Sequence, residues 1–161
     1  MSHQIVRMTM GYSVNQDRIY SDCLLSDGSL LRLWLTRRLV SRLTEYLNQK
    51  LASDSCTPHV ALDALMKTGH PTKPQEDPVR CAREDPCVLV VAVDVTSNAR
   101  QTTFTWRNDD AGLCAHFSLA HQRAAVWIAG LQSCFAVAGW QVPTTEHRPL
   151  IAPHLAESVL H

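Results

Sequence analysis

The stretch RIYSDCLLSDGSLLRLWL, residues 18–35, decides the fold predicted for the first part of the chain. Apolar and polar side chains alternate on both sides of its centre, as they do in half-buried strands. At the centre Asp27 and Gly28 both tolerate positive φ, which is typical of a tight hairpin turn. Residues 4–14 alternate in the same way, with Val6 and Met8 on the apolar side. We therefore expect an antiparallel meander of three strands.

The period of the apolar residues changes after this meander. Leucines recur every four residues from Leu35 to Leu51, and arginines occupy the opposite side. This pattern predicts an amphipathic helix, and Thr36 is a suitable N-cap. The leucine stripe of the helix is expected to pack on the meander.

The chain then passes through a proline-rich segment into a second run of strand-like stretches. Residues 53–87 contain five prolines and are interpreted as a linker, with a short helix possible at 59–67. Three strand patterns follow, at 88–95, 101–106 and 113–118. Ser118 is expected to cap a second helix that ends at Gly139.

These patterns predict an α+β protein of two tandem β-β-β-α units. The expected boundaries are 1–52 for the first unit, 53–87 for the linker, 88–140 for the second unit and 141–161 for a tail. The units share the order of their elements at an offset of about 82 residues. A divergent duplication is the favoured explanation, and a coincidental α+β meander is the alternative.

No motif assigns the chain to a named family. Its expected architecture alone is similar to that of the Pur-type and Whirly single-stranded nucleic-acid-binding proteins. Those proteins usually have four strands in each repeat, whereas three are expected here. Similarity of architecture does not by itself carry a function.

Composition argues against several classes of function. Fifteen basic and fifteen acidic residues leave no net charge, so a general attraction to nucleic acid or anionic lipid is not expected. The N-terminal residues lack the pattern of a secretory signal, and the apolar run 87–93 is too short to span a membrane. A cytoplasmic location without membrane passage is predicted, and the six cysteines are interpreted mostly as buried thiols.

The sequence contains no recognisable set of catalytic residues. A nucleophile elbow, a His-Glu-x-x-His pattern and a phosphate loop are all missing, so no enzymatic activity and no cofactor are predicted. Cys114, His116 and His121 are spaced so that they could approach one metal ion. A fourth ligand is not indicated, so structural roles are favoured for all three and no metal is predicted.

The meander face opposite the helix is the surface most suited to binding. Five of its side chains form the predicted binding surface: Arg7, Arg18, Tyr20, Arg32 and Trp34. The favoured interpretation is a non-enzymatic interaction protein that binds a protein partner or a second copy of itself, since interfaces are enriched in these residue types.

The alternative is a single-stranded nucleic-acid-binding protein whose aromatic side chains stack on bases. Residues 1–52 have seven basic and four acidic side chains, a balance of +3, which is compatible with this alternative. Arg37, Arg38 and Arg42 near the predicted helix start would then contact phosphates. The favoured interpretation of these three arginines is a solvated helix face.

Overall fold

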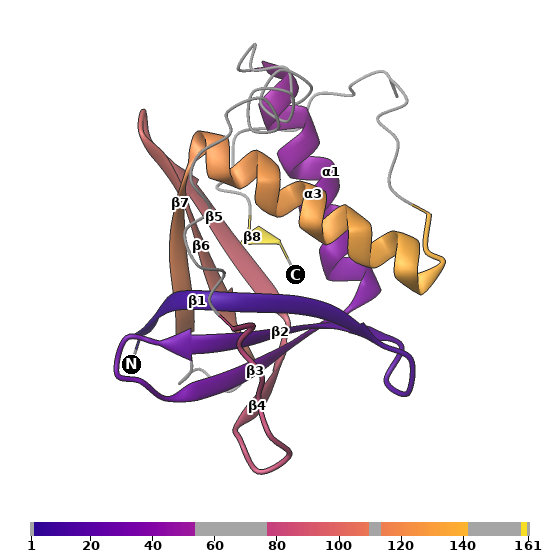
Figure 1. Ribbon diagram of the computed structural model, residues 1–161. Coiled ribbons are helices and arrows are strands. Elements are labelled where there is room, and N and C mark those ends of the chain that lie inside the picture. The colour runs from indigo at the N-terminus through magenta and orange to yellow at the C-terminus, as the bar shows by residue number, and fades with distance from the viewer. Residues whose placement is uncertain (1, 54–76, 110–113, 142–158, 161) are drawn as a thin grey trace.

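The computed structural model describes residues 2–53, 77–109, 114–141 and 159–160 (Figure 1). Its helices are α1 (Arg37–Ser53) and α3 (His121–Ala138). Its strands are β1 (Ser2–Ser13), β2 (Arg18–Leu25), β3 (Leu30–Leu35), β4 (Cys87–Val90), β5 (Ala92–Ser97), β6 (Gln101–Arg107), β7 (Cys114–Ala120) and β8 (Val159–Leu160). The short helix predicted at 59–67 lies outside the described residues.

All of these strands belong to one mixed sheet, in the order β4-β3-β2-β1-β7-β6-β5-β8. Within it, β1, β2 and β3 are antiparallel neighbours, and so are β5, β6 and β7. The two groups are joined by a parallel pairing of β1 with β7, while β4 pairs parallel with β3. In Figure 1 the β1–β3 layer crosses the β5–β7 layer, and both helices lie on one side of the crossing.

The sheet is nearly closed into a barrel by the segment that contains β4 and β5. The first part of this segment pairs with β3, and after Val91 the second part pairs with β6. The Val91 amide itself donates a hydrogen bond to the Arg107 carbonyl at 2.9 Å. One bent segment therefore contacts both halves of the sheet.

The prediction of two tandem β-β-β-α units is wrong, because the strands of both halves share one mixed sheet. A three-stranded meander leaves backbone donors and acceptors at its edges, and these need partners. Here the edge of β1 is paired with β7 and the edge of β3 with β4. The expected similarity to Pur-type and Whirly architecture depended on those tandem units.

The first helix forms where its period predicts. Its buried stripe of Leu39, Val40, Leu43 and Leu47 belongs to the same core as the inward-facing leucines of β3. The Leu39 amide donates to Thr36 Oγ1 at 3.3 Å, which confirms Thr36 as the N-cap. No helix among the described residues is both long enough and apolar enough to cross a membrane.

The start of the second helix differs from the prediction. Strand β7 continues to Ala120, so Ser118 lies on the sheet, where its hydroxyl is 2.7 Å from that of Thr103. Ala120 precedes the helix and makes no side-chain capping bond. Gly139 ends the helix as predicted, with the left-handed φ of 67° that glycine adopts without strain.

Strand β1 contains a bulge, and the face predicted for Val6 is therefore wrong. The register of β1 against β2 shifts between Ile5 and Arg7. Ile5 is consequently buried, whereas Val6 is 56% exposed. An extra residue in a strand reverses the alternation on one side of it, and a simple period of two cannot show this.

Candidate functional site

The strand register places all five residues of the predicted binding surface on one side of the β1–β3 layer. The inward-facing neighbours of these residues, such as Ile19 and Leu33, are buried in the core, whereas the five are each half-buried. We call the side away from the core the outer face. Alternation along each strand was enough to predict which side chains share it.

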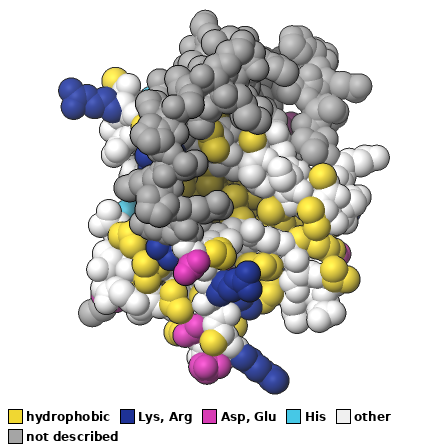
Figure 2. All heavy atoms as spheres, viewed as in Figure 1, with side chains coloured by type: hydrophobic (Ala, Val, Ile, Leu, Met, Phe, Trp, Pro, Cys, Tyr) yellow, Lys and Arg dark blue, Asp and Glu magenta, His cyan; other side chains and the backbone are white. Residues whose placement is uncertain are grey.

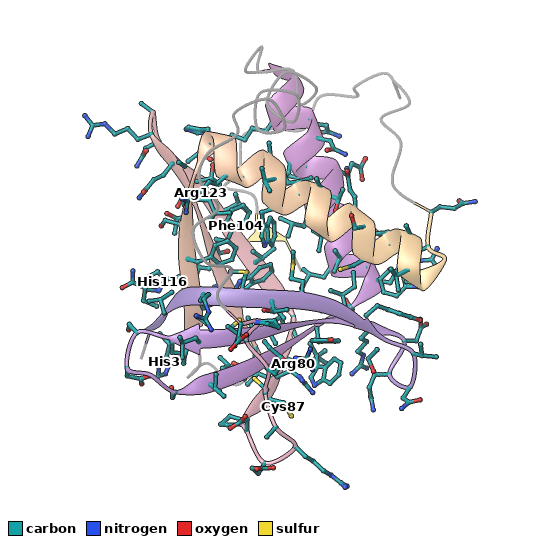
Figure 3. All side chains as sticks on the ribbon, viewed as in Figure 1. His3, Arg80, Cys87, Phe104, His116 and Arg123 are labelled. Carbon is teal, nitrogen blue, oxygen red and sulfur yellow. The ribbon has the colours of Figure 1, made fainter. Side chains whose placement is uncertain are left out.

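Part of the outer face is covered by residues 77–86, which we call the strap. The Arg7 guanidinium donates to the Asp77 carbonyl at 3.0 Å, and the Val79 amide donates to Thr9 Oγ1 at 2.9 Å. The Val79 side chain is buried, although the sequence places it in a proline-rich linker. In Figure 3, Arg80 of the strap and Cys87 of β4 lie on the side of the β1–β3 layer away from the helices.

Asp22 is the polar centre of the covered region. It lies directly opposite Arg32 in the β2–β3 pairing. Its two oxygens accept from Arg32 Nε at 2.6 Å and Nη2 at 2.8 Å, and Oδ2 also accepts from the Cys81 amide at 2.9 Å. Arg32 Nη2 donates in addition to the Cys81 carbonyl at 3.2 Å. The Asp22–Arg32 ion pair therefore joins the sheet to the strap at Cys81.

The surroundings of Asp22 favour its charged form. Burial raises the pKa of this carboxyl, but the hydrogen bonds from Arg32 and from the Cys81 amide outweigh burial and hold its pKa below the usual value. Asp22 was not among the predicted site residues. The signal that could have identified it is an acidic residue facing an arginine across a predicted hairpin.

The uncovered part of the outer face holds a row of large side chains. Tyr20, Trp34 and Leu89 lie directly opposite one another on β2, β3 and β4, and we call them the aromatic row. The rings of Tyr20 and Trp34 meet edge to face, with centroids 6.0 Å apart. Leu89 is 39% exposed, so its side chain is open to solvent beside the two rings.

Both aromatic side chains of the row are held in place. The guanidinium carbon of Arg32 lies 5.0 Å from the Tyr20 ring centroid and 5.6 Å from that of Trp34. Gly11 lies opposite Tyr20 on β1, and a Cβ there would be 2.4 Å from the Tyr20 hydroxyl oxygen. The absence of a side chain at Gly11 therefore leaves the space that the Tyr20 phenol occupies.

The arginines proposed for phosphate contacts are not part of this row. Arg37, Arg38 and Arg42 are exposed on α1, whose first turn contains no acidic residue. The guanidinium of Arg37 lies 5.7 Å from the ring centroid of Trp140, which follows α3. This contact directs Arg37 to the helical side of the molecule.

The described residues give no metal site that includes His116 and His121, the two histidines that the sequence spaces close to Cys114. His121 Nε2 lies 2.9 Å from the Asn98 carbonyl oxygen, and His116 lies opposite Thr105 on β6. The Cys114 side chain is outside the described part of the chain. Among the described residues, no group of three His, Cys, Asp or Glu side chains could hold a metal ion.

The strap itself has charged side chains of both signs. Its charged residues are Asp77, Arg80, Arg83, Glu84 and Asp85. Figure 2 shows basic and acidic side chains next to one another on the lower part of the molecule. Such a mixture does not form the continuous basic surface that attracts a polyanion.

Comparison with known proteins gives no relative: no family model matches the chain, and neither a curated protein nor a solved structure matches it significantly. Function is therefore inferred from the chemistry of the outer face.

Proposed function

We propose that this protein is a non-enzymatic binding module whose outer face, with the aromatic row at its centre, binds a protein partner. The observation that supports it best is Arg32, which is fixed by Asp22 and lies over both rings of the row. The few residues that carry most of the binding energy in protein interfaces are enriched in Trp, Tyr and Arg. Side chains that are already ordered lose little rotamer entropy on binding.

The same arrangement disfavours a nucleic-acid ligand. A single strand binds by stacking its bases on open ring faces. Here the Arg32 guanidinium already lies over the rings of Tyr20 and Trp34. The strap next to the row has three acidic and two basic residues, so it adds no attraction for phosphates.

Site-specific photocrosslinking tests the proposal. A photoreactive phenylalanine analogue replaces Leu89 on the aromatic row or, as a control, Thr103 on the outward side of β6. We expect a protein adduct at position 89 in extract of the source cells, its loss when Trp34→Ala is added, and no equivalent adduct at position 103. Equal adducts at both positions, or an adduct that Trp34→Ala leaves unchanged, would contradict the proposal.

Two further measurements separate the kinds of partner. Sedimentation velocity over a range of concentrations shows whether the partner is a second copy, since Trp34→Ala would then abolish a dimer. Titration with labelled single-stranded oligonucleotides at two salt concentrations tests the alternative. Salt-sensitive binding that is lost in Trp34→Ala and in Arg37→Ala/Arg38→Ala/Arg42→Ala would favour nucleic acid and overturn the proposal.

A further inference from the structure

We infer that the covered part of the outer face is a binding site for an extended peptide, filled by the strap in the free protein and by a segment of the protein partner in the complex. This inference rests on the proposed function, because it takes the partner to be a protein. It adds the form of the ligand, an extended backbone with one small apolar side chain, and the way in which the site is kept closed.

The site recognises backbone groups at every second residue of the strap. The four contacts come from side chains on three adjacent strands: Arg7 with the Asp77 carbonyl, Thr9 with the Val79 amide, Asp22 with the Cys81 amide and Arg32 with the Cys81 carbonyl. Because they use backbone donors and acceptors, they suit any extended peptide and do not select a sequence.

Val79 is the one strap position at which burial restricts the type of side chain that the site can accept. Val79 is 5% exposed, whereas its neighbours Pro78 and Arg80 are exposed. A small branched apolar residue at this position satisfies the site, and a charged one would be buried without a described partner. The partner segment is therefore expected to have such a residue with extended backbone on both sides.

The docked strap has the features of an occupant that can be exchanged. Most of its side chains are exposed, and each ordered residue loses conformational entropy that a single hydrogen bond only partly offsets. Its advantage over a free peptide is its attachment to β4, where the Pro86 carbonyl accepts from the Arg32 amide at 2.9 Å. Such a tether acts as a high local concentration.

Binding in the strap's place would put the partner next to the aromatic row. Asp22 and Tyr20 are two residues apart on the same face of β2, so the peptide site and the row are adjacent. A backbone carbonyl at the position of that of Cys81 would also keep Arg32 in place over the rings. The two parts of the face would then bind one continuous partner surface.

The test uses the full chain and a synthetic peptide with the sequence of residues 77–86 that contains Cys81→Ser to prevent disulfide formation. Val79→Asp in the protein weakens the strap and opens the site. We expect the labelled peptide to bind this variant about tenfold more tightly than the wild-type protein, because an occupied site lowers apparent affinity by the free fraction. A peptide that carries Val79→Asp should not bind either protein.

Controls separate an open site from a damaged fold. Val79→Gly opens the site without adding a charge, and near-wild-type circular dichroism shows that either variant is folded. Adding Thr9→Val removes the acceptor for the Val79 amide and should weaken peptide binding at least threefold. Equal peptide binding by wild type and both strap variants, or binding that Thr9→Val does not affect, would overturn the inference.

The result can be distinguished from a failure of the proposed function. Trp34→Ala should abolish the partner adduct at position 89, whereas Thr9→Val should weaken peptide binding. A partner adduct without peptide binding would retain the aromatic row as an interface and reject the peptide site. Peptide binding without any partner adduct would retain the peptide site and reject the aromatic row as an interface.

Discussion

Arg32 and Asp22 face each other across the β2–β3 hairpin and form two parallel hydrogen bonds, at 2.6 and 2.8 Å. The pair lies on the outer face of the sheet, yet the Asp22 side chain is only 3% exposed and that of Arg32 26%. The strap covers the carboxylate, and the guanidinium extends from it over Tyr20 and Trp34. One ion pair thus links the covered and the uncovered parts of the face.

Replacing Asp22 should destabilise the protein more than replacing the acidic partner of an exposed pair. Asp22→Asn leaves a half-buried guanidinium without its charged partner, and we expect a loss of about 2 kcal/mol in the free energy of unfolding. Asp94→Asn is the matched control, because the Arg107–Asp94 pair is 39% and 34% exposed. It should cost less than about 1 kcal/mol. Urea unfolding measures both, and equal losses would contradict this account.

The same carboxylate should make stability depend on pH under acidic conditions. The pKa of Asp22 is lower in the folded protein than in the unfolded chain, where it is about 3.9, so the unfolded state binds the proton more readily. Its contribution is therefore fully present above about pH 5 and is lost as the pH falls through the folded pKa. The free energy of unfolding is measured for wild type and for Asp22→Asn from pH 7 to pH 2. The difference between the two proteins should shrink below pH 4. A difference that grows below pH 4 would contradict a lowered pKa of Asp22 in the folded protein.

The described thiols should react with iodoacetamide in a fixed order. Burial raises the pKa of Cys23 to about 12, and burial together with the Asp22 carboxylate raises the pKa of Cys81 to about 11. At pH 8 about one Cys81 side chain in a thousand is the reactive thiolate. Cys87 is exposed and should be labelled first. Peptide mapping by mass spectrometry gives the order, and Asp22→Asn should accelerate labelling of Cys81 specifically.

A methyl group at Gly11 should displace Tyr20 from the aromatic row. Its carbon would lie 2.4 Å from the Tyr20 hydroxyl oxygen, so Gly11→Ala should cost about 1 kcal/mol and reduce partner crosslinking at position 89. At Gly130 on α3 the nearest such contact is the Met10 methyl carbon at 3.5 Å. Gly130→Ala should therefore be neutral or stabilising, as in other helix interiors. Similar losses for the two variants would show that the row does not depend on Gly11.

Two hydroxyl residues near the helix starts should differ in their effect. Thr36 accepts the Leu39 amide, so Thr36→Ala should lower the free energy of unfolding by about 1 kcal/mol. Ser118 lies on β7 and contacts only the hydroxyl of Thr103 among its described side-chain partners. Ser118→Ala should therefore cost less than about 0.5 kcal/mol. Thermal unfolding of both variants checks the comparison.

Much of the outer face could be predicted because alternation along a strand is local. Arg18, Tyr20 and Asp22 share a face whatever the strand pairs with, and Arg32 and Trp34 follow from the hairpin at Asp27 and Gly28. The bulge after Ile5 interrupted the rule in β1 and moved Val6 outward. A bulge depends on the partner strand, so no pattern within β1 alone indicates it.

The strap could not be predicted from its own residues. Segment 77–86 has the proline and charge content of a linker, and its contacts are with residues between 49 and 70 positions earlier in the chain. Only Val79 is buried within it. A single apolar residue in a polar stretch is a weak signal, because many linkers contain one.

By itself, the sequence determined the strands of the first meander, the position and cap of α1, the end of α3 and the membership of the outer face, since each depends on residues close together in the chain. Only the tertiary structure decided that both halves share one nearly closed sheet, that β1 pairs with β7, and that the strap lies over Asp22 and Arg32. These pairings close long loops, and their free energy comes from contacts between segments whose local patterns are compatible with many partners.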